Sequence, residues 1–333
     1  MSEPVLRLAN LEDIPRIKDF INRTWKRYNL INNEELFQFY FVRGDQVNFL
    51  LAEDEKGTLY GTLAFIYCGE RRRPDLGLTL FKTIKSPYTL LGVRMYYKLK
   101  ELLDYRVAFS QNMVPNTALL HKMMGHTVGE FEHWYRLSDR EKYRIAVVND
   151  KSIPEARAGD IELVPFPDAG ELFKYFIPPD DLVPYKDERY IRRRYYEYPA
   201  YNYTVYGLRD RTKGTIQSVL VCREVHVEGE IVLKIVDYIG REEDFSQLSG
   251  ELQRLILENG YEYIEMYQYG LKEQTMKEAG LVRREKEDVN IIPTYLEPLA
   301  QVNTDYMLYY TDHVDTIRMF RADCDMDRPN LEE

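Results

Sequence analysis

The most unusual stretch of this 333-residue sequence is "KTIKSPYTLLGVRMYYKLK", residues 82–100. It holds five basic side chains and no carboxylate, although acidic residues outnumber basic ones 55 to 45 over the whole chain. The five are Lys82, Lys85, Arg94, Lys98 and Lys100. So much positive charge in one short stretch predicts that the protein binds an anion there.

The same stretch joins a predicted strand, 76–84, to a predicted helix, 92–103. The first N–H groups of a helix have no partner within it, and the helix dipole adds about half a positive charge at that end. A phosphate fits such a position, because Gly92 allows close approach to the backbone, and Lys85, Arg94 and Lys98 can neutralise its charge. The alternative is the solvated basic face of a surface helix, which is what most charge runs are.

A second cluster, "ERYIRRRYYEYPAYNYTVYG", occupies residues 188–207 of a chain that has 28 tyrosines and two tryptophans. A tyrosine ring offers a flat apolar face and a hydroxyl group, which suits polar, ring-shaped ligands. Arg193 and its neighbours can bind a diphosphate, while Tyr196 or Tyr203 stacks on a base or a sugar. The alternative is an amphipathic helix with its rings in the core and its arginines in solvent.

The composition narrows the classes of function. A net charge of −10 argues against nonspecific binding of nucleic acid, which depends on many Lys and Arg contacts to phosphate. No uncharged run approaches the length of a membrane span, and the three cysteines and five histidines show no zinc spacing. "DCDMD", residues 323–327, resembles the start of a calcium loop, but Arg328 stands where that loop needs glycine. We expect a cytoplasmic protein with no metal.

The elements that must position these groups alternate between strand and helix, and the order occurs twice. In the first half we predict strands or hairpins at 5–9, 48–68, 76–84, 106–111, 130–138 and 143–148, and helices at 11–27, 33–42, 92–103 and 116–125. A polar segment with Pro and Gly, 149–160, predicts a linker. We therefore predict two domains, 1–150 and 160–315, and an acidic C-terminal tail, 316–333.

The first half has the order strand, basic loop, helix, strand and a short helix that ends at glycine. This order resembles the GNAT superfamily of acyl-CoA N-acyltransferases over residues 4–148, and more faintly over 161–311. The resemblance implies an α/β fold of two tandem GNAT-like domains, each a mixed, mostly antiparallel sheet flanked by helices. "WKRYNLI" and "DMDRPN" are similar to bacterial members in amino-sugar and surface-polysaccharide pathways. Residues 87–92 replace the family's Gln/Arg-x-x-Gly-x-Gly/Ala loop, and only the last glycine matches.

The resemblance also implies a cofactor, acetyl-CoA or another acyl-CoA, and a set of residues that hold it. These are Leu80, Lys82, Lys85, Ser86, Leu90, Leu91, Gly92, Val93 and Arg94. A backbone N–H near residues 80–82 would stabilise the oxyanion. The family's general acid falls four residues before the closing glycine, which gives His121, and Asn112 matches a side chain that contacts the cofactor. The alternative for His121 is a helical histidine without a catalytic role.

The general base is left unassigned, because the strand 76–84 carries no carboxylate. Asp75, Glu130, Glu132 and His133 are the candidates nearby in the sequence. The second half differs at its matching loop, 241–244, which holds three acids and one base. Acids stabilise the start of a helix but repel a phosphate, so we expect one CoA site per chain.

Two functions of different classes follow. The first is an N-acyltransferase that moves an acyl group from acyl-CoA to a small amine, such as an amino sugar or a nucleotide-linked amino sugar. The second is a non-catalytic GNAT-fold binding or scaffold protein, which the altered loop and the missing base favour. For the enzyme we expect the acceptor between the two halves, at Arg193, Tyr196 and Tyr203. No nucleic acid or membrane partner is expected, and a homodimer is compatible with the sequence.

Overall fold

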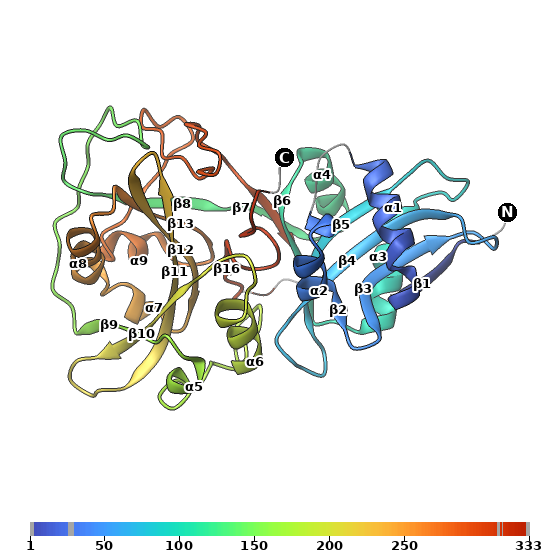
Figure 1. Ribbon diagram of the computed structural model, residues 1–333, viewed down its shortest axis with the longest axis horizontal. Coiled ribbons are helices and arrows are strands. Elements are labelled where there is room, and N and C mark those ends of the chain that lie inside the picture. Colours follow the sequence, from blue (N-terminus) through green and yellow to red (C-terminus); the bar gives the residue numbers. More distant parts are fainter. Residues whose placement is uncertain (1–2, 26–29, 312–313, 315, 331–333) are drawn as a thin grey trace.

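The structure, a computed structural model, describes residues 3–25, 30–311, 314 and 316–330. Residues 26–29, the "KRYN" of the "WKRYNLI" stretch, lie outside the described residues. Two mixed sheets of eight strands each stand side by side, and helices flank both (Figure 1). This confirms the predicted α/β fold of two similar halves.

The first sheet has the strand order β1-β3-β4-β5-β6-β15-β7, and β2 pairs with β3. Its elements are β1 (Val5–Asn10), η1 (Leu11–Asp13), α1 (Ile14–Thr24), η2 (Leu30–Asn32), α2 (Glu34–Phe41), β2 (Val42–Arg43), β3 (Gln46–Glu53), β4 (Leu59–Cys68), β5 (Asp75–Thr83), α3 (Leu91–Leu103), β6 (Val107–Met113), α4 (Pro115–Met123), β7 (Thr127–Glu130) and β15 (Met307–Tyr310). Most strands of this sheet pair antiparallel, and β5 with β6 is parallel.

The second sheet has the order β14-β8-β13-β12-β11-β10-β9, and β16 pairs with β13. Its elements are β8 (Glu132–Leu137), β9 (Ile161–Pro165), α5 (Ala169–Leu172), α6 (Glu188–Ile191), the π-helical turn η3 (Arg192–Tyr196), β10 (Thr204–Asp210), β11 (Ile216–Val227), β12 (Glu230–Ile239), α7 (Glu242–Phe245), α8 (Ser249–Asn259), β13 (Tyr263–Tyr269), α9 (Glu273–Glu278), β14 (Val282–Arg283) and β16 (Met319–Phe320). Residues 143–148, predicted as a strand, form only one bridge, between Val147 and Ile291.

Both faces of the first sheet are buried. Along β3, Phe49 and Leu51 pack in the core formed with α1 and α2, whereas Leu50 and Ala52 pack in the core formed with α3. Successive side chains of a strand point to opposite faces, so an unbroken apolar run predicts a strand that is covered on both sides. The helices α1 and α2 therefore lie on one face and α3 on the other (Figure 1).

The two sheets exchange one strand each. The strand β8 follows β7 directly in the sequence but lies in the second sheet, where Trp134 pairs with Met266 of β13. In return, β15 lies between β6 and β7 of the first sheet, where Tyr309 pairs with Ser110 and with Val128. A division at residues 150–160 therefore does not separate the sheets, because 132–137 belong to the second and 307–310 to the first.

The predicted acidic tail is buried structure. The C-terminal segment, residues 317–330, runs between the two halves (red in Figure 1). Its strand β16 pairs with β13, and Asp323 and Asp327 have no exposed surface. Its alternation of acidic and apolar residues resembles a solvated tail in sequence. In the structure Asp323 pairs with Lys186 and Asp327 with Arg223, both from elsewhere in the fold, and Asp325 pairs with Arg328 of the same segment. Among the described residues, no helix is long and apolar enough to cross a membrane.

Candidate functional site

The two central strands of the first sheet diverge at the predicted cofactor site. β5 and β6 pair over Asp75–Gly77 and Val107–Phe109, and the ladder ends there. Just beyond, β5 carries one extra residue against β4: Thr79 pairs with Ala64, but Lys82 pairs with Thr62. Such a bulge leaves backbone groups unpaired and re-aims them. The stretch 80–82, predicted to supply the oxyanion donor, is this bulge, and Leu80 has a φ of 44°.

The helix α3 begins where the strands separate, and no side chain caps its first N–H groups. The residue before it, Leu90, has a φ of 52° and is 68% exposed, whereas Leu91 is buried and anchors the first turn. A Cβ at Gly92 would lie 3.4 Å from the ring of Phe81 on β5. The helix start is therefore held against the bulged strand with its free N–H groups available to an anion.

The side chains predicted to bind the cofactor differ in their contacts and in their exposure. Lys82 lies over the ring of Trp25, with its Nζ 5.6 Å from the ring centroid, and Lys85 is exposed. Arg94 forms an ion pair with Glu3. The Ser86 Oγ accepts a hydrogen bond from the Tyr88 N–H at 3.2 Å, which shapes the loop itself. Val93 is half-buried in the first turn.

Neither His121, the predicted general acid, nor Asn112, the predicted cofactor contact, has the surroundings that its predicted role suggests. His121 is buried on α4, its ring stacks on Tyr309 with centroids 3.4 Å apart, and its Nδ1 lies 3.0 Å from the Nδ1 of His126. Burial lowers the pKa of His121 to about 4, so the imidazole is neutral at pH 7 and is not the imidazolium of that prediction. Asn112 is exposed at a bulge of β6, with a φ of 57° that asparagine tolerates.

The cluster at 188–207 does lie between the halves, but only part of it faces the first half. Arg193 donates a hydrogen bond to the Phe39 carbonyl and lies 4.5 Å from the centroid of that ring. The hydroxyl of Tyr196 donates to the Phe166 carbonyl, and that of Tyr203 to Asp327. Of the three residues predicted to bind the acceptor, Arg193 lies at the interface, Tyr196 packs inside the second half, and Tyr203 packs against the cores of both halves.

A cavity of about 270 Å³ opens beside Arg193, between α2 and strands β2–β4 on one side and α6 and η3 on the other. It is lined by Phe39, Tyr40, Val42, Arg43, Gly44, Asn48, Ile66, Tyr67, Gly69, Glu70, Asp187, Arg189, Tyr190, Arg193, Arg194 and Cys324. Cys324 connects the cavity to the diverging strands, because a Cβ at Gly77 of β5 would lie 2.8 Å from its Sγ. Cys324 therefore lies between the cavity and the strand from which the bulge begins.

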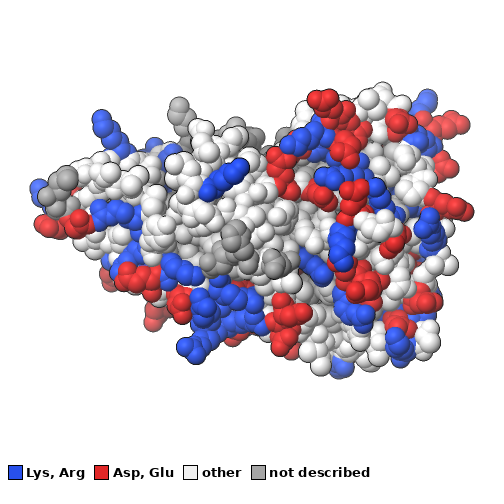
Figure 2. Space-filling view, turned by 180° about the vertical axis from the view of Figure 1, so that it is seen from behind, with Lys and Arg blue, Asp and Glu red and all other residues white. Residues whose placement is uncertain are grey.

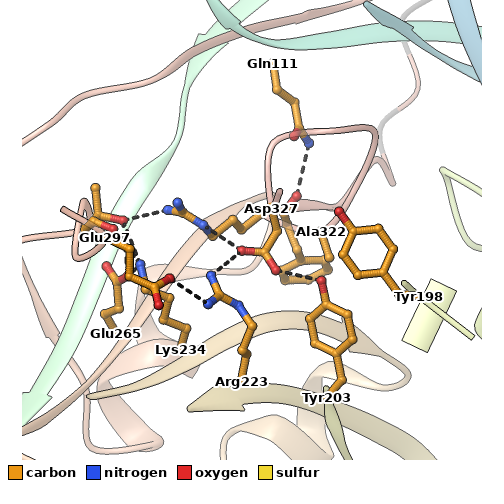
Figure 3. A network of polar contacts seen from close by, with 12 residues as sticks. Gln111, Tyr198, Tyr203, Arg223, Lys234, Glu265, Glu297, Ala322 and Asp327 are labelled. Carbon is orange, nitrogen blue, oxygen red and sulfur yellow. Dashed lines mark hydrogen bonds and ion pairs between the residues drawn. The ribbon is translucent and has the colours of Figure 1, made fainter. Parts of the chain in front are cut away.

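A buried ionic network fixes the wall of this cavity (Figure 3). The Asp327 carboxylate accepts hydrogen bonds from Tyr203 at 2.8 Å, Arg223 at 3.0 Å and Arg321 at 3.2 Å. The charges of the two arginines hold the pKa of Asp327 well below its usual range. Arg194, which lines the cavity, donates to the carbonyls of Ala322 and Asp327. The C-terminal segment is thus held in place as part of the site.

A second cavity, of about 510 Å³, lies where the sheets exchange strands and holds three of the four candidate bases. His133 Nδ1 accepts a hydrogen bond from Arg284, its Nε2 lies 2.9 Å from Glu265, and burial lowers its pKa. Glu130 pairs with Lys286, and Glu132 with Arg283. The fourth candidate, Asp75, is buried against Arg106. Neither cavity is lined by the predicted cofactor residues.

The matching place in the second half is filled by the chain itself. β12 and β13 pair over Val232–Ile235 and then diverge, but the Ala322 N–H donates to the Val236 carbonyl in the gap. At the start of α8, a Cβ on Gly250 would lie 2.9 Å from the Arg157 carbonyl of the linker. The C-terminal segment and the linker therefore occupy the positions that a cofactor needs.

No protein-family model matches the sequence, and no curated protein is similar to it at the level of sequence. Solved structures are similar in fold. A GCN5-related N-acetyltransferase from Anabaena variabilis is 12% identical with a TM-score of 0.54, and the match covers 92% of this chain and 72% of that one. A probable N-acyltransferase of unknown function from Enterococcus faecalis is 8% identical, with the same TM-score and coverage. The chain therefore has a GNAT-type fold over both halves.

Proposed function

We propose that this protein is an N-acyltransferase that moves an acyl group from acyl-CoA, such as acetyl-CoA, to a small primary amine. The amine nitrogen attacks the thioester carbonyl carbon, the C–N bond forms, the C–S bond breaks, and CoA leaves as a thiol with the proton that the amine loses. One observation carries the proposal: β5 and β6 diverge in front of the uncapped helix α3, beside a cavity for a second substrate.

Each part of this arrangement has a chemical role. The first N–H groups of α3 would bind the CoA diphosphate, and Lys82, Lys85 and Arg94 would balance its charge. Arg94 would exchange Glu3 for a phosphate, which keeps the guanidinium paired. The backbone N–H groups of the bulge at 80–82 would stabilise the oxyanion of the tetrahedral intermediate.

Transfer is direct in this proposal. Cys324 lines the cavity, but burial raises the pKa of its thiol, and only a thiolate is an effective nucleophile. The next residue, Asp325, accepts a hydrogen bond from Thr79 of β5 at 2.8 Å, which places a carboxylate beside the diverging strands. We assign Asp325 as the group that takes the proton of the amine.

Titration calorimetry with CoA and acetyl-CoA tests the cofactor site. We expect one site per chain, and Arg94→Ala should weaken binding by about 1–3 kcal/mol, the scale of a charged hydrogen bond. Lys98→Ala is the matched control on the same helix, because Lys98 pairs with Glu101 and lies about two turns from the helix start. Absence of CoA binding at millimolar concentration rejects the enzyme. CoA binding without transfer to any amine supports the scaffold alternative.

A further inference from the structure

We propose that the 270 Å³ cavity selects a small primary amine that carries an anionic group, either a carboxylate or a phosphate. This inference rests on the proposed function, because the amine is the acyl acceptor of that reaction. Two features of the cavity carry it: a buried amide without a partner at its inner end, and an excess of arginine at its mouth.

The buried amide belongs to Asn48 of β3. Asn48 lines the cavity and is 4% exposed, and its Oδ1 has no hydrogen-bond partner among the described residues. An unpaired buried acceptor costs about 1–3 kcal/mol, so folded proteins rarely keep one without a use for it. An acceptor oxygen needs a donor, and the N–H of a bound amine supplies one. Asn48 therefore marks the place of the amine.

The inner end of the cavity also faces the reacting centre. Ile66 of β4 and Cys324 line it together with Asn48, and Cys324 packs against Gly77 on β5. The ladder between β5 and β6 ends at Gly77. An amine held by Asn48 thus points toward the strand whose bulge would stabilise the oxyanion.

The mouth of the cavity carries more positive than negative charge. Arg43 and Arg189 pair with the same carboxylate, that of Glu70. Arg193 forms no ion pair with any described residue and donates to the Phe39 carbonyl instead. The remaining acid, Asp187, is engaged by the backbone: it caps α6 and accepts from the Glu70 N–H at 2.6 Å.

Three guanidinium groups at the mouth therefore face two carboxylates, and only one of these, Glu70, is paired with an arginine of the mouth. The planar fork of arginine matches a carboxylate or a phosphate with two parallel hydrogen bonds. Arg193 is exposed and lies against the ring of Phe39. Desolvation by this packing lowers the pKa of Arg193, so an incoming anion would relieve an unfavourable charge. The anionic end of the acceptor is assigned to this mouth.

The size of the cavity limits the acceptor further. A volume of about 270 Å³ is at the lower end of the range for small-molecule sites. Between the amide and the arginines its walls are apolar and aromatic, with Val42, Tyr67 and Tyr190. The cavity suits a molecule of the size of an amino acid or a monosaccharide phosphate. A nucleotide-linked sugar, one of the acceptors that the sequence suggests, exceeds this space.

Calorimetry on the full chain without CoA tests the inference, with two matched pairs of amines as probes. Glucosamine 6-phosphate is compared with glucosamine, and 4-aminobutanoate with butylamine. We expect the member of one pair that carries the anionic group to bind about tenfold or more tightly than the partner without it, as one charged hydrogen bond predicts. The pair that shows the difference identifies the anion as phosphate or carboxylate. Equal affinity within both pairs overturns the proposal.

Two variants locate the effect. Arg193→Met should remove the preference for the charged probe, whereas the adjacent Arg192→Met should keep it, because Arg192 pairs with Glu188 and does not line the cavity. Asn48→Leu should lose amine binding without loss of thermal stability, since it removes an unpaired buried oxygen. Identical behaviour of the two arginine variants rejects the site even if Asn48→Leu fails to fold.

The same titrations separate this inference from the proposed function. Amine binding is measured without CoA, and CoA binding is measured without an amine. Failure of CoA binding with normal selection among the amines would reject the acyltransferase and leave the charged-amine site standing. Normal CoA binding with no selection among the amines would reject the charged-amine site and leave the acyltransferase proposal standing.

Discussion

Gly77 on β5 and Cys324 in the C-terminal segment are in such close contact that a Cβ at position 77 would lie 2.8 Å from the Cys324 Sγ and 2.9 Å from its Cβ. This contact joins the last residue of β5 that pairs with β6 to the segment that lines the cavity. It also explains the backbone of Cys324, whose φ of 58° turns the chain away from the strand. Glycine at position 77 is thus required by space.

Gly77→Ala should therefore displace the C-terminal segment. We expect a loss of about 1–3 kcal/mol in the free energy of unfolding, the usual range for an overpacked core. Cys324→Gly should restore much of it in the double variant, since glycine adopts a positive φ without strain and removes both clashing atoms. Chemical denaturation of the two single variants and the double variant measures the coupling. Additive effects would show that the two residues are independent.

The exchanged strands predict that the halves do not fold separately. A fragment of residues 1–150 lacks β15, which leaves β6 and β7 without their shared partner and exposes two strand edges. It also carries β8, whose apolar residues belong to the other sheet. We expect the fragment to be unfolded or aggregated by circular dichroism and size exclusion, and the full chain to unfold in one calorimetric transition. A folded, monomeric fragment would contradict this.

Much of the fold is predictable because each element carries a local signal. The apolar run of β3 predicts a strand buried on both faces, and the spacing of Ile17, Phe20 and Ile21 predicts the buried face of α1. The local sequence does not determine which strand another strand pairs with. Nothing in "EHWYRL" (132–137) indicates that it leaves the first half, because a strand pairs through backbone groups that every residue has.

The candidate site is also predictable from the sequence only in part. The start of α3 is predictable, because a strand, a basic loop and a helix follow one another in the sequence, and this order favours an anion-binding helix start. The cavity is not, because Asn48 and Cys324 are unremarkable in their own stretches and meet only through the C-terminal segment. The run of three arginines did indicate the site, but not which arginine lines it. Arg192 is partly exposed, Arg193 is exposed at the cavity, and Arg194 is buried.

Charged side chains are sparse on one face of the first half and dense over the second (Figure 2). Exposed apolar side chains on α4, among them Leu119 at 60% and Met123 at 78%, belong to this half. We predict that CoA binding weakens with rising salt, since exposed charge pairs are screened, with a Debye length of about 10 Å at 0.1 M. Calorimetry at several salt concentrations measures this, and affinity that is independent of salt would show that the backbone of α3 binds alone.

Asp325→Asn tests the proposed proton acceptor. The amide oxygen can still accept the Thr79 hydrogen bond, so the fold should be kept while the base is lost. We expect the turnover number to fall by about 10²–10⁴, the range for a general base, with little change in the KM for acyl-CoA. Asp181→Asn, in an exposed loop, is the matched control and should leave turnover unchanged. Full activity of Asp325→Asn with an unaltered pH profile would show that Asp325 is not the proton acceptor and that water takes the proton of the amine.

Asp323 should make stability depend on pH in a direction opposite to most carboxylates. It lies in a buried cluster with Lys186, Asp237 and Tyr195: the Lys186 Nζ is 2.6 Å from Asp237 and 2.8 Å from Asp323. Burial raises the pKa of Asp323 to about 6 against a usual value of 3.8, and the neighbouring Asp237 adds to the shift. Two carboxylates thus share one ammonium group.

Between pH 4 and pH 6 the folded chain therefore holds a proton on Asp323 that the unfolded chain has lost, so the contribution of Asp323 to stability falls as pH rises through this window. The lowered pKa values of His121 and His133 act in the opposite sense, so the test is a difference between two proteins. Asp323→Asn keeps an acceptor for the Phe320 N–H and cannot ionise. Relative to the original chain, it should gain roughly 1–3 kcal/mol between pH 4 and pH 7, at about 1.4 kcal/mol for each unit of pKa. Denaturant titrations at both pH values measure the gain, and a difference that stays constant with pH would show that Asp323 ionises normally beside Lys186.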